Sequence, residues 1–229
     1  MKFFETHVRD TKKETSDSYS FLFDIPEGYT WKAGQHAVWR FVCFADLDEE
    51  EQARVFTIAS APQDGFLMLT TRIGEKHSPL KEALLTRIQK GDTVKISAPM
   101  GKFAFHEEKK CSLAVAGGIG ITPIRALLRE YLEENREDHQ VVLYYADERN
   151  EFCYEDLWAA LTKLPNIHIE KLSDSDLCAE KVKTFAKEHG DQAEYLIAGS
   201  PGMNKFYEKL LTEADIEKKD IVTDVFLGY

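Results

Sequence analysis

The first half of the chain alternates apolar and polar residues in short runs, which is the pattern of strands in an antiparallel sheet. Turn residues such as those in Pro26-Glu-Gly28 and Pro62-Gln-Asp-Gly65 separate the runs. The predicted strands are His7–Arg9, Ser18–Phe23, His36–Val42, Val55–Ile58, Leu67–Arg72 and Thr93–Ile96, with one helix at about residues 79–89. Strands of this length and spacing predict a small six-stranded antiparallel barrel over residues 1–106.

The second half changes to a repeat of one apolar strand followed by one helix. The predicted strands are Leu113–Ala116, Val141–Tyr145, Ile167–Ile169, Tyr195–Ala198 and Ile221–Phe226. The predicted helices are Pro123–Asn135, Glu155–Lys163, Ala179–Glu188 and Asn204–Ala214. This alternation predicts a second domain over residues 107–229, with a five-stranded, largely parallel sheet covered on both faces. Ligands of such sheets bind beyond the carboxyl ends of the strands.

Composition narrows the class of protein. The chain has 229 residues, 43% of them hydrophobic, which suits two small globular domains. No apolar run approaches the roughly 18 residues of a membrane span, and residues 1–9 have no signal core. We therefore expect a cytoplasmic protein with no membrane insertion. The four cysteines and seven histidines form no spaced ligand motif, so no metal site is expected.

The charge is unevenly distributed and argues against nucleic-acid binding. Residues 1–106 hold 14 basic and 15 acidic residues, which leaves 15 basic and 25 acidic residues for the second half. The net charge of −11 therefore lies almost entirely in the second domain. A protein that neutralises phosphates along a nucleic acid needs a basic stripe, and the sequence contains none.

Two glycine turns fall at the carboxyl ends of predicted strands. Gly117-Gly-Ile-Gly-Ile-Thr-Pro123 joins an apolar strand to a helix, where exposed backbone N–H groups can approach a phosphate. Thr122 and Pro123 suit the start of that helix as cap and first-turn residue, so capping alone accounts for them. Capping does not explain the presence of glycine at positions 118 and 120. The second turn is Ala198-Gly-Ser-Pro-Gly-Met203.

These segments, in this order, resemble the ferredoxin–NADP reductase superfamily, in which an FAD-binding barrel precedes a nicotinamide-binding α/β domain. The resemblance spans nearly the whole chain. Arg54-Val-Phe-Thr57 is similar to the family's Arg-x-Tyr-Ser/Thr segment, with Phe56 in place of the usual tyrosine. The run from Gly117 matches the nicotinamide-cofactor turn at every position. Ala198–Met203 resembles Cys-Gly-Pro-x-x-Met, with Ala198 in place of cysteine. Ala98–Phe103 resembles the barrel closure and is expected to be structural.

The resemblance implies the flavin contacts. Arg54 would pair with the flavin diphosphate, Phe56 would lie along the ribityl chain and ring, and the hydroxyl of Thr57 would approach flavin N5. A core strand with an edge arginine is the alternative. Further FAD contacts are expected from Val55, Thr71, Arg72, Ile73, His77 and Ser78. Ser78 could also be an ordinary helix cap.

The resemblance also implies the nicotinamide-nucleotide contacts. These are expected from Gly118, Ile119, Gly120, Ile121, Thr122, Asp147, Gly199, Ser200, Pro201 and Met203. The chain stops at Phe226-Leu-Gly-Tyr229, and terminal aromatics in this family cover the flavin face that nicotinamide must reach. Tyr229 is therefore expected to act as a movable lid with a role in catalysis, and Phe226 is the second candidate. A packed edge strand is the alternative.

The sequence leaves the choice of nucleotide open and favours NADH slightly. Asp147 or Glu148, after the second strand of the α/β domain, would repel a 2′-phosphate, whereas Arg149 could attract one. We expect a flavin-dependent oxidoreductase that transfers hydride from NAD(P)H to FAD and passes electrons to an unidentified acceptor, a ferredoxin, a flavodoxin or another molecule. The alternative is a non-catalytic flavin-binding electron-transfer or regulatory subunit of a larger complex.

Overall fold

The structure is a computed structural model that describes residues 2–106, 108–134 and 138–226. Its contacts divide the chain into two units, Met1–Lys102 and Phe103–Tyr229, which are described separately below. The boundary predicted from the sequence, between residues 106 and 107, lies a few residues further along the chain. The first unit contains an antiparallel six-stranded sheet and the second a parallel five-stranded sheet, so the predicted fold class is confirmed.

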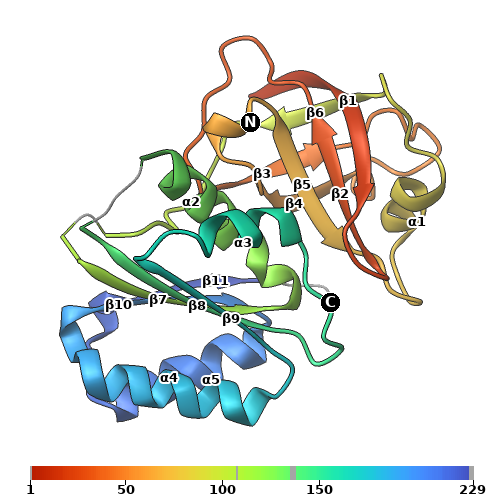
Figure 1. Ribbon diagram of the computed structural model, residues 1–229. Coiled ribbons are helices and arrows are strands. Elements are labelled where there is room, and N and C mark those ends of the chain that lie inside the picture. The colour runs from red at the N-terminus through yellow and green to blue at the C-terminus, as the bar shows by residue number, and fades with distance from the viewer. Residues whose placement is uncertain (1, 107, 135–137, 227–229) are drawn as a thin grey trace. The chain divides into compact units, whose positions relative to one another are not determined.

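The sheet of the first unit has the strand order β4-β3-β6-β1-β2-β5 (Figure 1). Its strands are β1 (Phe3–Lys13), β2 (Ser18–Phe23), β3 (His36–Arg40), β4 (Ala53–Thr57), β5 (Leu67–Arg72) and β6 (Thr93–Ser97). The two ends of this order meet, because the N–H of Ala59 donates to Met68 O at 2.7 Å and Met68 N donates to Ser60 Oγ at 3.0 Å. Helix α1 (Pro79–Thr86) lies between β5 and β6 along the chain.

The core of the first unit consists of the apolar side chains that alternation directs inward. Phe23 and Trp39 are fully buried, with their ring centroids 4.8 Å apart, and Phe21, Phe41 and Ile58 pack in the same cluster. The first strand is longer than the predicted His7–Arg9. It runs over 11 residues because β6 and β2 pair with successive parts of it, although most of its side chains are exposed. Pairing rather than side-chain burial therefore defines this strand.

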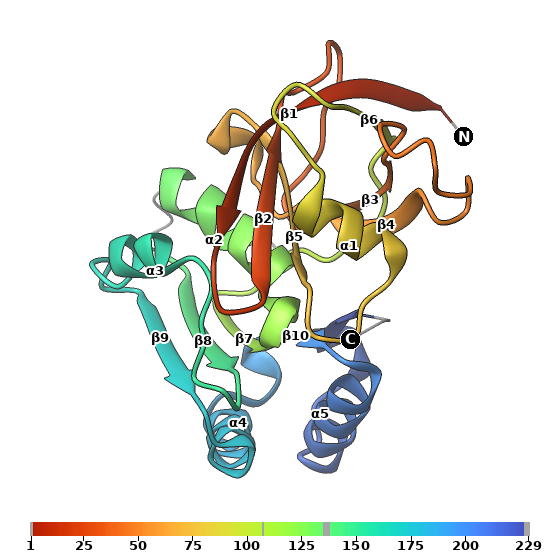
Figure 2. The ribbon, with the colours of Figure 1, turned by 90° about the vertical axis from the view of Figure 1, so that its right-hand side faces the viewer.

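The second unit is a parallel sheet with the strand order β11-β10-β7-β8-β9. Its strands are β7 (Cys111–Gly117), β8 (Gln140–Ala146), β9 (Ile167–Leu172), β10 (Glu194–Gly199) and β11 (Ile221–Val225). Its helices are α2 (Ile121–Glu134), α3 (Glu155–Leu161), α4 (Ser175–His189) and α5 (Pro201–Glu213). Helices α2 and α3 cover one face of the sheet, and α4 and α5 cover the other (Figures 1 and 2).

The registers place the ends of four strands of the second sheet along one edge. Gly117 of β7 pairs with Ala146 of β8, and Gly199 of β10 pairs with Val225 of β11. Ala116 of β7 pairs with Ala198 of β10, and each of them directly precedes the glycine that ends its strand. Both glycine turns and the segment from Asp147 therefore leave the sheet at its carboxyl edge, which is where a nucleotide is expected in this class of sheet.

Candidate functional site

Arg54 lies on β4, an edge strand of the six-stranded sheet that pairs within it only with β3. The side chain is exposed, and its guanidinium donates to the carbonyl oxygens of Glu50 at 2.6 Å and Ala53 at 2.7 Å. No carboxylate of a described residue pairs with it. A cation that is accessible and not neutralised by a neighbouring acid is suited to bind an anionic ligand.

The three residues after Arg54 differ in their exposure. Phe56 packs against the core of the first unit, while Val55 is 59% exposed at the sheet edge. Thr57 is buried beside His36 on the neighbouring strand. Val55 is the most exposed of the large apolar side chains among the described residues. An apolar residue at an exposed edge next to a free cation suits a ligand with an aromatic ring and a phosphate.

A second group of cations lies where β5 ends and α1 begins. Ser78 is the N-cap of α1, since its hydroxyl accepts from Lys81 N at 3.4 Å, and Pro79 follows at the first helical position. Burial, followed by the charge of Arg72, lowers the pKa of Lys81. A diphosphate at the start of the helix would stabilise the charges of both Lys81 and Arg72. Sequence reasoning missed Lys81, although its position three residues after the cap could have indicated it.

His77 does not face this cation pair with a free ring nitrogen. Its Nδ1 lies 2.6 Å from Gly74 O and its Nε2 lies 2.6 Å from Glu82 Oε2. The hydrogen bond to Glu82, followed by the bond to Gly74, raises the pKa of His77. These bonds brace the turn before α1. Thr71 on β5 and Ile73 directly after it are buried, and Arg72 also pairs with Asp17 at 3.6 Å.

The turn after β7 contains Gly118 and Gly120, and the structure requires glycine at each position for a different reason. Gly118 has φ +50°, which a residue with a side chain rarely adopts. A Cβ atom on Gly120 would lie 2.1 Å from Ala198 O and 2.9 Å from Gly199 Cα, both backbone atoms. Gly120 is therefore required for packing of α2 against the end of β10. Gly118 is the glycine that the backbone conformation of the turn requires, because its φ is positive.

The start of α2 differs in one detail from the sequence prediction. The turn Gly118–Gly120 is a short 3₁₀ segment that continues directly into α2 at Ile121. The Thr122 hydroxyl donates to Ile119 O at 3.1 Å, so it does not cap the helix by accepting from a backbone N–H group. The predicted capping role of Thr122 is wrong, because the helix begins at Ile121, two residues before the predicted Pro123. Pro123 still lies in the first turn, as predicted.

The two glycine turns share one side chain. Cβ atoms on Gly117 and Gly199 would lie 2.2 Å and 2.4 Å from Met203 Sδ. Ser200 caps α5, with its Oγ 3.3 Å from Met203 N, and Pro201 follows. The N–H of Phe226 donates to Gly199 O at 3.0 Å, which holds the end of the chain's last strand against this turn. Tyr229, the predicted lid, lies outside the described residues.

Asp147 and Arg149 form a closed turn after β8. The carboxylate of Asp147 is buried, and its Oδ1 accepts the N–H of Arg149 at 3.0 Å. The Arg149 guanidinium pairs with Asp147 Oδ1 at 3.6 Å and with Glu151 Oε2 at 3.9 Å. Two carboxylates therefore contact the Arg149 guanidinium.

Comparisons with known proteins agree with this architecture. Residues 114–209 match the family model described as the oxidoreductase NAD-binding domain. One subunit of the Na(+)-translocating NADH-quinone reductase of Haemophilus influenzae (strain 86-028NP) is 26% identical over 231 residues, covering 90% of this chain and 55% of that protein. Its counterpart in Pasteurella multocida (strain Pm70) is 27% identical, with 90% and 56% covered. The chain therefore spans about half the length of these relatives.

Solved structures share the fold over nearly the whole chain. The ferredoxin reductase in carbazole 1,9a-dioxygenase has a TM-score of 0.81 at 19% identity, covering 99% of this chain and 70% of that one. The ferredoxin-NADP+ reductase from Plasmodium falciparum, with 2′P-AMP, has a TM-score of 0.80 at 14% identity, covering 98% and 96%. The fold and these matches define a class of two-domain flavoprotein reductases.

Residues 114–209 match the oxidoreductase NAD-binding domain, and the whole chain shares the two-domain fold of the ferredoxin reductases. At the level of this class, the prediction of an NAD(P)H-dependent flavoprotein reductase is confirmed. Among the described residues, no helix is both long and apolar enough to cross a membrane. No group of histidine, cysteine and acidic side chains there is arranged to hold a metal ion.

Proposed function

We propose that this chain binds FAD through the Arg54 strand and the start of α1, and binds NADH at the carboxyl edge of the parallel sheet. When bound, the two cofactors supply the redox chemistry, which is transfer of a hydride between nicotinamide and flavin. The chain supplies binding, orientation and charge. The observation that carries the proposal is the pair of anion sites in the first unit, each built from cations that a diphosphate would neutralise.

Arg54 provides the first anchor and the cations at α1 provide the second. Arg54 has no acidic partner among the described residues. At the helix start, Lys81 is partly buried near Arg72, and Arg72 also pairs with Asp17 at 3.6 Å. Binding of a diphosphate between such groups adds charge-assisted hydrogen bonds. Thr57, three residues beyond Arg54, is the hydroxyl that we assign to the flavin ring, with Val55 and Phe56 along it.

The nucleotide site is assigned to Gly118, Ile119 and Ile121 on one turn and to Gly199–Met203 on the other. Gly118 opens the backbone at the start of α2, where N–H groups and the helix dipole favour phosphate. Phe226 is the described aromatic that we assign to the nicotinamide side, because it is hydrogen-bonded to Gly199. Gly120 and Thr122 support the turn from behind.

The Asp147 turn supports NADH over NADPH. Arg149 already has two carboxylate partners, so a 2′-phosphate would have to compete with Asp147 and Glu151 for it. The buried Asp147 carboxylate would also repel that phosphate. The name of the relatives, which contains NADH-quinone reductase, is consistent with the same donor.

We assign no electron acceptor. The relatives support the alternative proposal, in which the chain is a non-catalytic subunit. They are subunits by name, and this chain corresponds to about half of them. As a subunit, the chain could hold flavin for electron transfer without oxidising NADH itself. A single experiment separates the two: the purified yellow protein is mixed with NADH without oxygen. Rapid bleaching of the flavin absorbance supports the reductase. A flavin that is released by heat as FAD but is not reduced by NADH or NADPH favours the non-catalytic subunit.

A further inference from the structure

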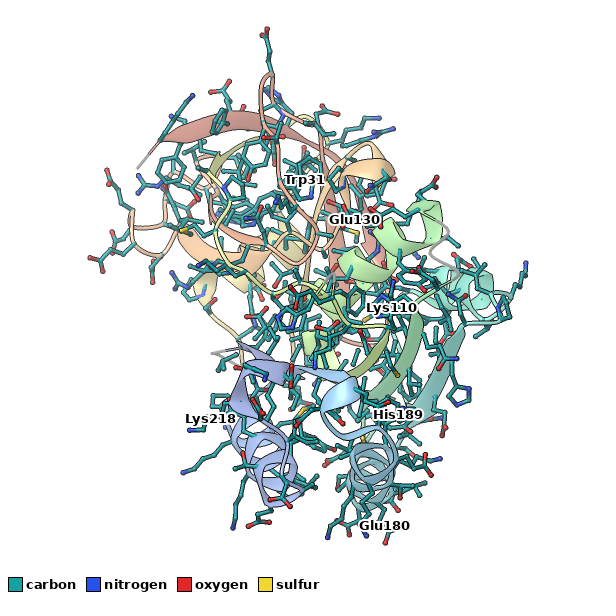
Figure 3. All side chains as sticks on the ribbon, turned by 90° about the vertical axis from the view of Figure 1, so that its left-hand side faces the viewer. Trp31, Lys110, Glu130, Glu180, His189 and Lys218 are labelled. Carbon is teal, nitrogen blue, oxygen red and sulfur yellow. The ribbon has the colours of Figure 1, made fainter. Side chains whose placement is uncertain are left out.

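The segment that follows the first unit is attached to the amino edge of the parallel sheet, the edge opposite the proposed nucleotide site. The Phe105 ring packs edge-on against His139 and Tyr131, with centroids 5.4 Å and 6.4 Å away. The Lys109 ammonium pairs with the buried Asp220 at 2.7 Å. Figure 3 looks onto this edge and labels Lys110, which directly precedes β7.

The central anchor between these two is Glu194, the first residue of β10. Its side chain is completely buried, and its carboxylate accepts the N–H of His106 at 2.9 Å. It also accepts the Ser112 hydroxyl at 2.6 Å, and the His106 ring nitrogen Nδ1 lies 3.3 Å away. Burial of a carboxylate costs free energy, so the full set of hydrogen bonds is needed to hold it there.

The network extends inward through Ser112. The Ser112 Oγ lies 2.7 Å from Nε2 of the buried His139, whose carbonyl accepts from Tyr131 and from Asn166 Nδ2 at 2.8 Å. Glu194 therefore ties the segment at His106 to the starts of β7, β8 and β9. This edge is remote from the glycine turns along every strand, so the nucleotide site does not explain it.

The first unit holds the other end of the same segment. Met100 and His36 exchange two backbone hydrogen bonds, at 2.8 Å and 2.9 Å. Gly101 has φ +98°, and a Cβ atom there would lie 2.9 Å from the His36 ring. Residues 102–104, between these anchors, make no hydrogen bond to another described residue and belong to no helix or strand.

We propose that Glu194 is a positioning residue for hydride transfer: it fixes the chain from Phe105 onward to the nucleotide-binding unit and confines motion between the units to residues 102–104. The proposal rests on the proposed function, because hydride can pass only when the two units bring their cofactors together. Three residues span at most about 11 Å, so a firm anchor at each end restricts the relative placement of the units. Loss of the Glu194 anchor would lengthen the part of the connection that no hydrogen bond holds, and would lower the population of the reactive arrangement.

The test compares Glu194→Ala, Glu194→Gln and the exposed control Glu213→Ala. Hydrogen exchange of the His106 amide, measured by NMR in the holoprotein, reports the anchor directly. In Glu194→Ala it should become roughly 10- to 100-fold faster, as for loss of a hydrogen bond to a charged acceptor. Glutamine keeps one acceptor for His106 and can donate to Ser112, so Glu194→Gln should stay close to the parent. Unchanged exchange in Glu194→Ala, or equal acceleration in both variants, would overturn the anchor.

Stopped-flow reduction of the flavin by NADH tests the positioning role. Glu194→Ala should lower the maximal rate at saturating NADH at least several-fold, while FAD content and the dissociation constant of NAD+ stay at parent values. Glu194→Gln should restore the rate. An accelerated amide exchange with an unchanged maximal rate would overturn the positioning role. A parent that is not reduced by NADH would instead contradict the proposed function, and then the exchange experiment alone decides the anchor.

If Glu194→Ala does not fold, the parent protein still decides the anchor. The His106 amide should be protected like a strand amide, whereas the Ala104 amide, two residues earlier, should exchange at nearly its intrinsic rate. Equal exchange at both positions would overturn the proposal.

Discussion

Gly120 lies against the backbone of Ala198, and a Cβ atom on this glycine would be 2.1 Å from the Ala198 carbonyl oxygen. This contact joins the start of α2 to the end of β10 without any ligand. It changes the role of the residue, because a glycine in a phosphate-binding turn is usually explained by the approach of the phosphate. Here the neighbouring strand accounts for it.

Replacement of Gly120 should therefore destabilise the protein even without nucleotide. Gly120→Ala forces backbone to move at two turns, and overpacking of this kind costs about 1–3 kcal/mol or more. Urea unfolding without added nucleotide measures the loss. Gly202→Ala is the matched control, because a Cβ atom there has open space and α5 should gain slightly in stability. Equal stability of the Gly120 variant and the parent would contradict the packing role.

Arg54→Ala should weaken FAD binding with little effect on stability. Its guanidinium contacts only exposed carbonyl groups in the described structure, so little folding energy is lost. Loss of one charge-assisted contact to phosphate should raise the FAD dissociation constant by roughly 10- to 100-fold, or about 1.5–3 kcal/mol. Fluorescence titration of the apoprotein with FAD measures it. Arg9→Ala, an exposed arginine on β1, is the control. The assignment fails if both variants bind FAD as the parent does.

Glu151→Gln should shift nucleotide preference toward NADPH. The change removes one of the two carboxylates that hold Arg149 and leaves Asp147 in place. A partly released guanidinium can approach a 2′-phosphate, so NADP+ should bind about two- to fivefold more tightly, as for one surface ion pair. NAD+ affinity should change little. Difference spectra on titration with both nucleotides report this, with Glu155→Gln as the control. An unchanged ratio of the two affinities would exclude Glu151 as a determinant.

Glu194 should make stability depend on pH in a defined direction. Burial raises the pKa of its carboxyl above the usual value, against the opposing effects of Ser112, His106 and Lys109. The folded state therefore takes up the proton before the unfolded chain does. The free energy of unfolding therefore increases as the pH falls through the raised pKa of Glu194. The increase is complete below the usual carboxyl value of about 4.5.

Unfolding free energies of the parent and Glu194→Gln at pH 7 and pH 5 test this sign. Because the glutamine cannot titrate, the parent should gain stability relative to the variant on acidification. The comparison cancels the titration of groups that do not interact with Glu194. A parent that loses stability relative to Glu194→Gln between these pH values would show that the carboxyl pKa is lowered instead.

Much of this protein can be predicted from the sequence because its signals are local. Alternation in the first half and the strand–helix repeat in the second predict both sheets, since side-chain period follows from backbone geometry. Pro79 after Ser78 marks a helix start for the same reason. Helix α5 begins at Pro201, three residues before the predicted Asn204. The class of cofactor followed from three short segments whose order matches one superfamily.

Other features depend on contacts between distant parts of the chain. The packing of Gly120 on Ala198, the nearness of Arg72 to Lys81, and the double ion pair of Arg149 have no periodic signal. Glu194 is the clearest case, since nothing near it in the sequence distinguishes it from the exposed glutamates. The sequence by itself determined the two domains, their sheets and the two glycine turns, because backbone pattern and turn chemistry are local. Only the tertiary structure decided which polar groups are buried together, because burial and hydrogen-bond partnership arise when strands far apart in the chain become neighbours.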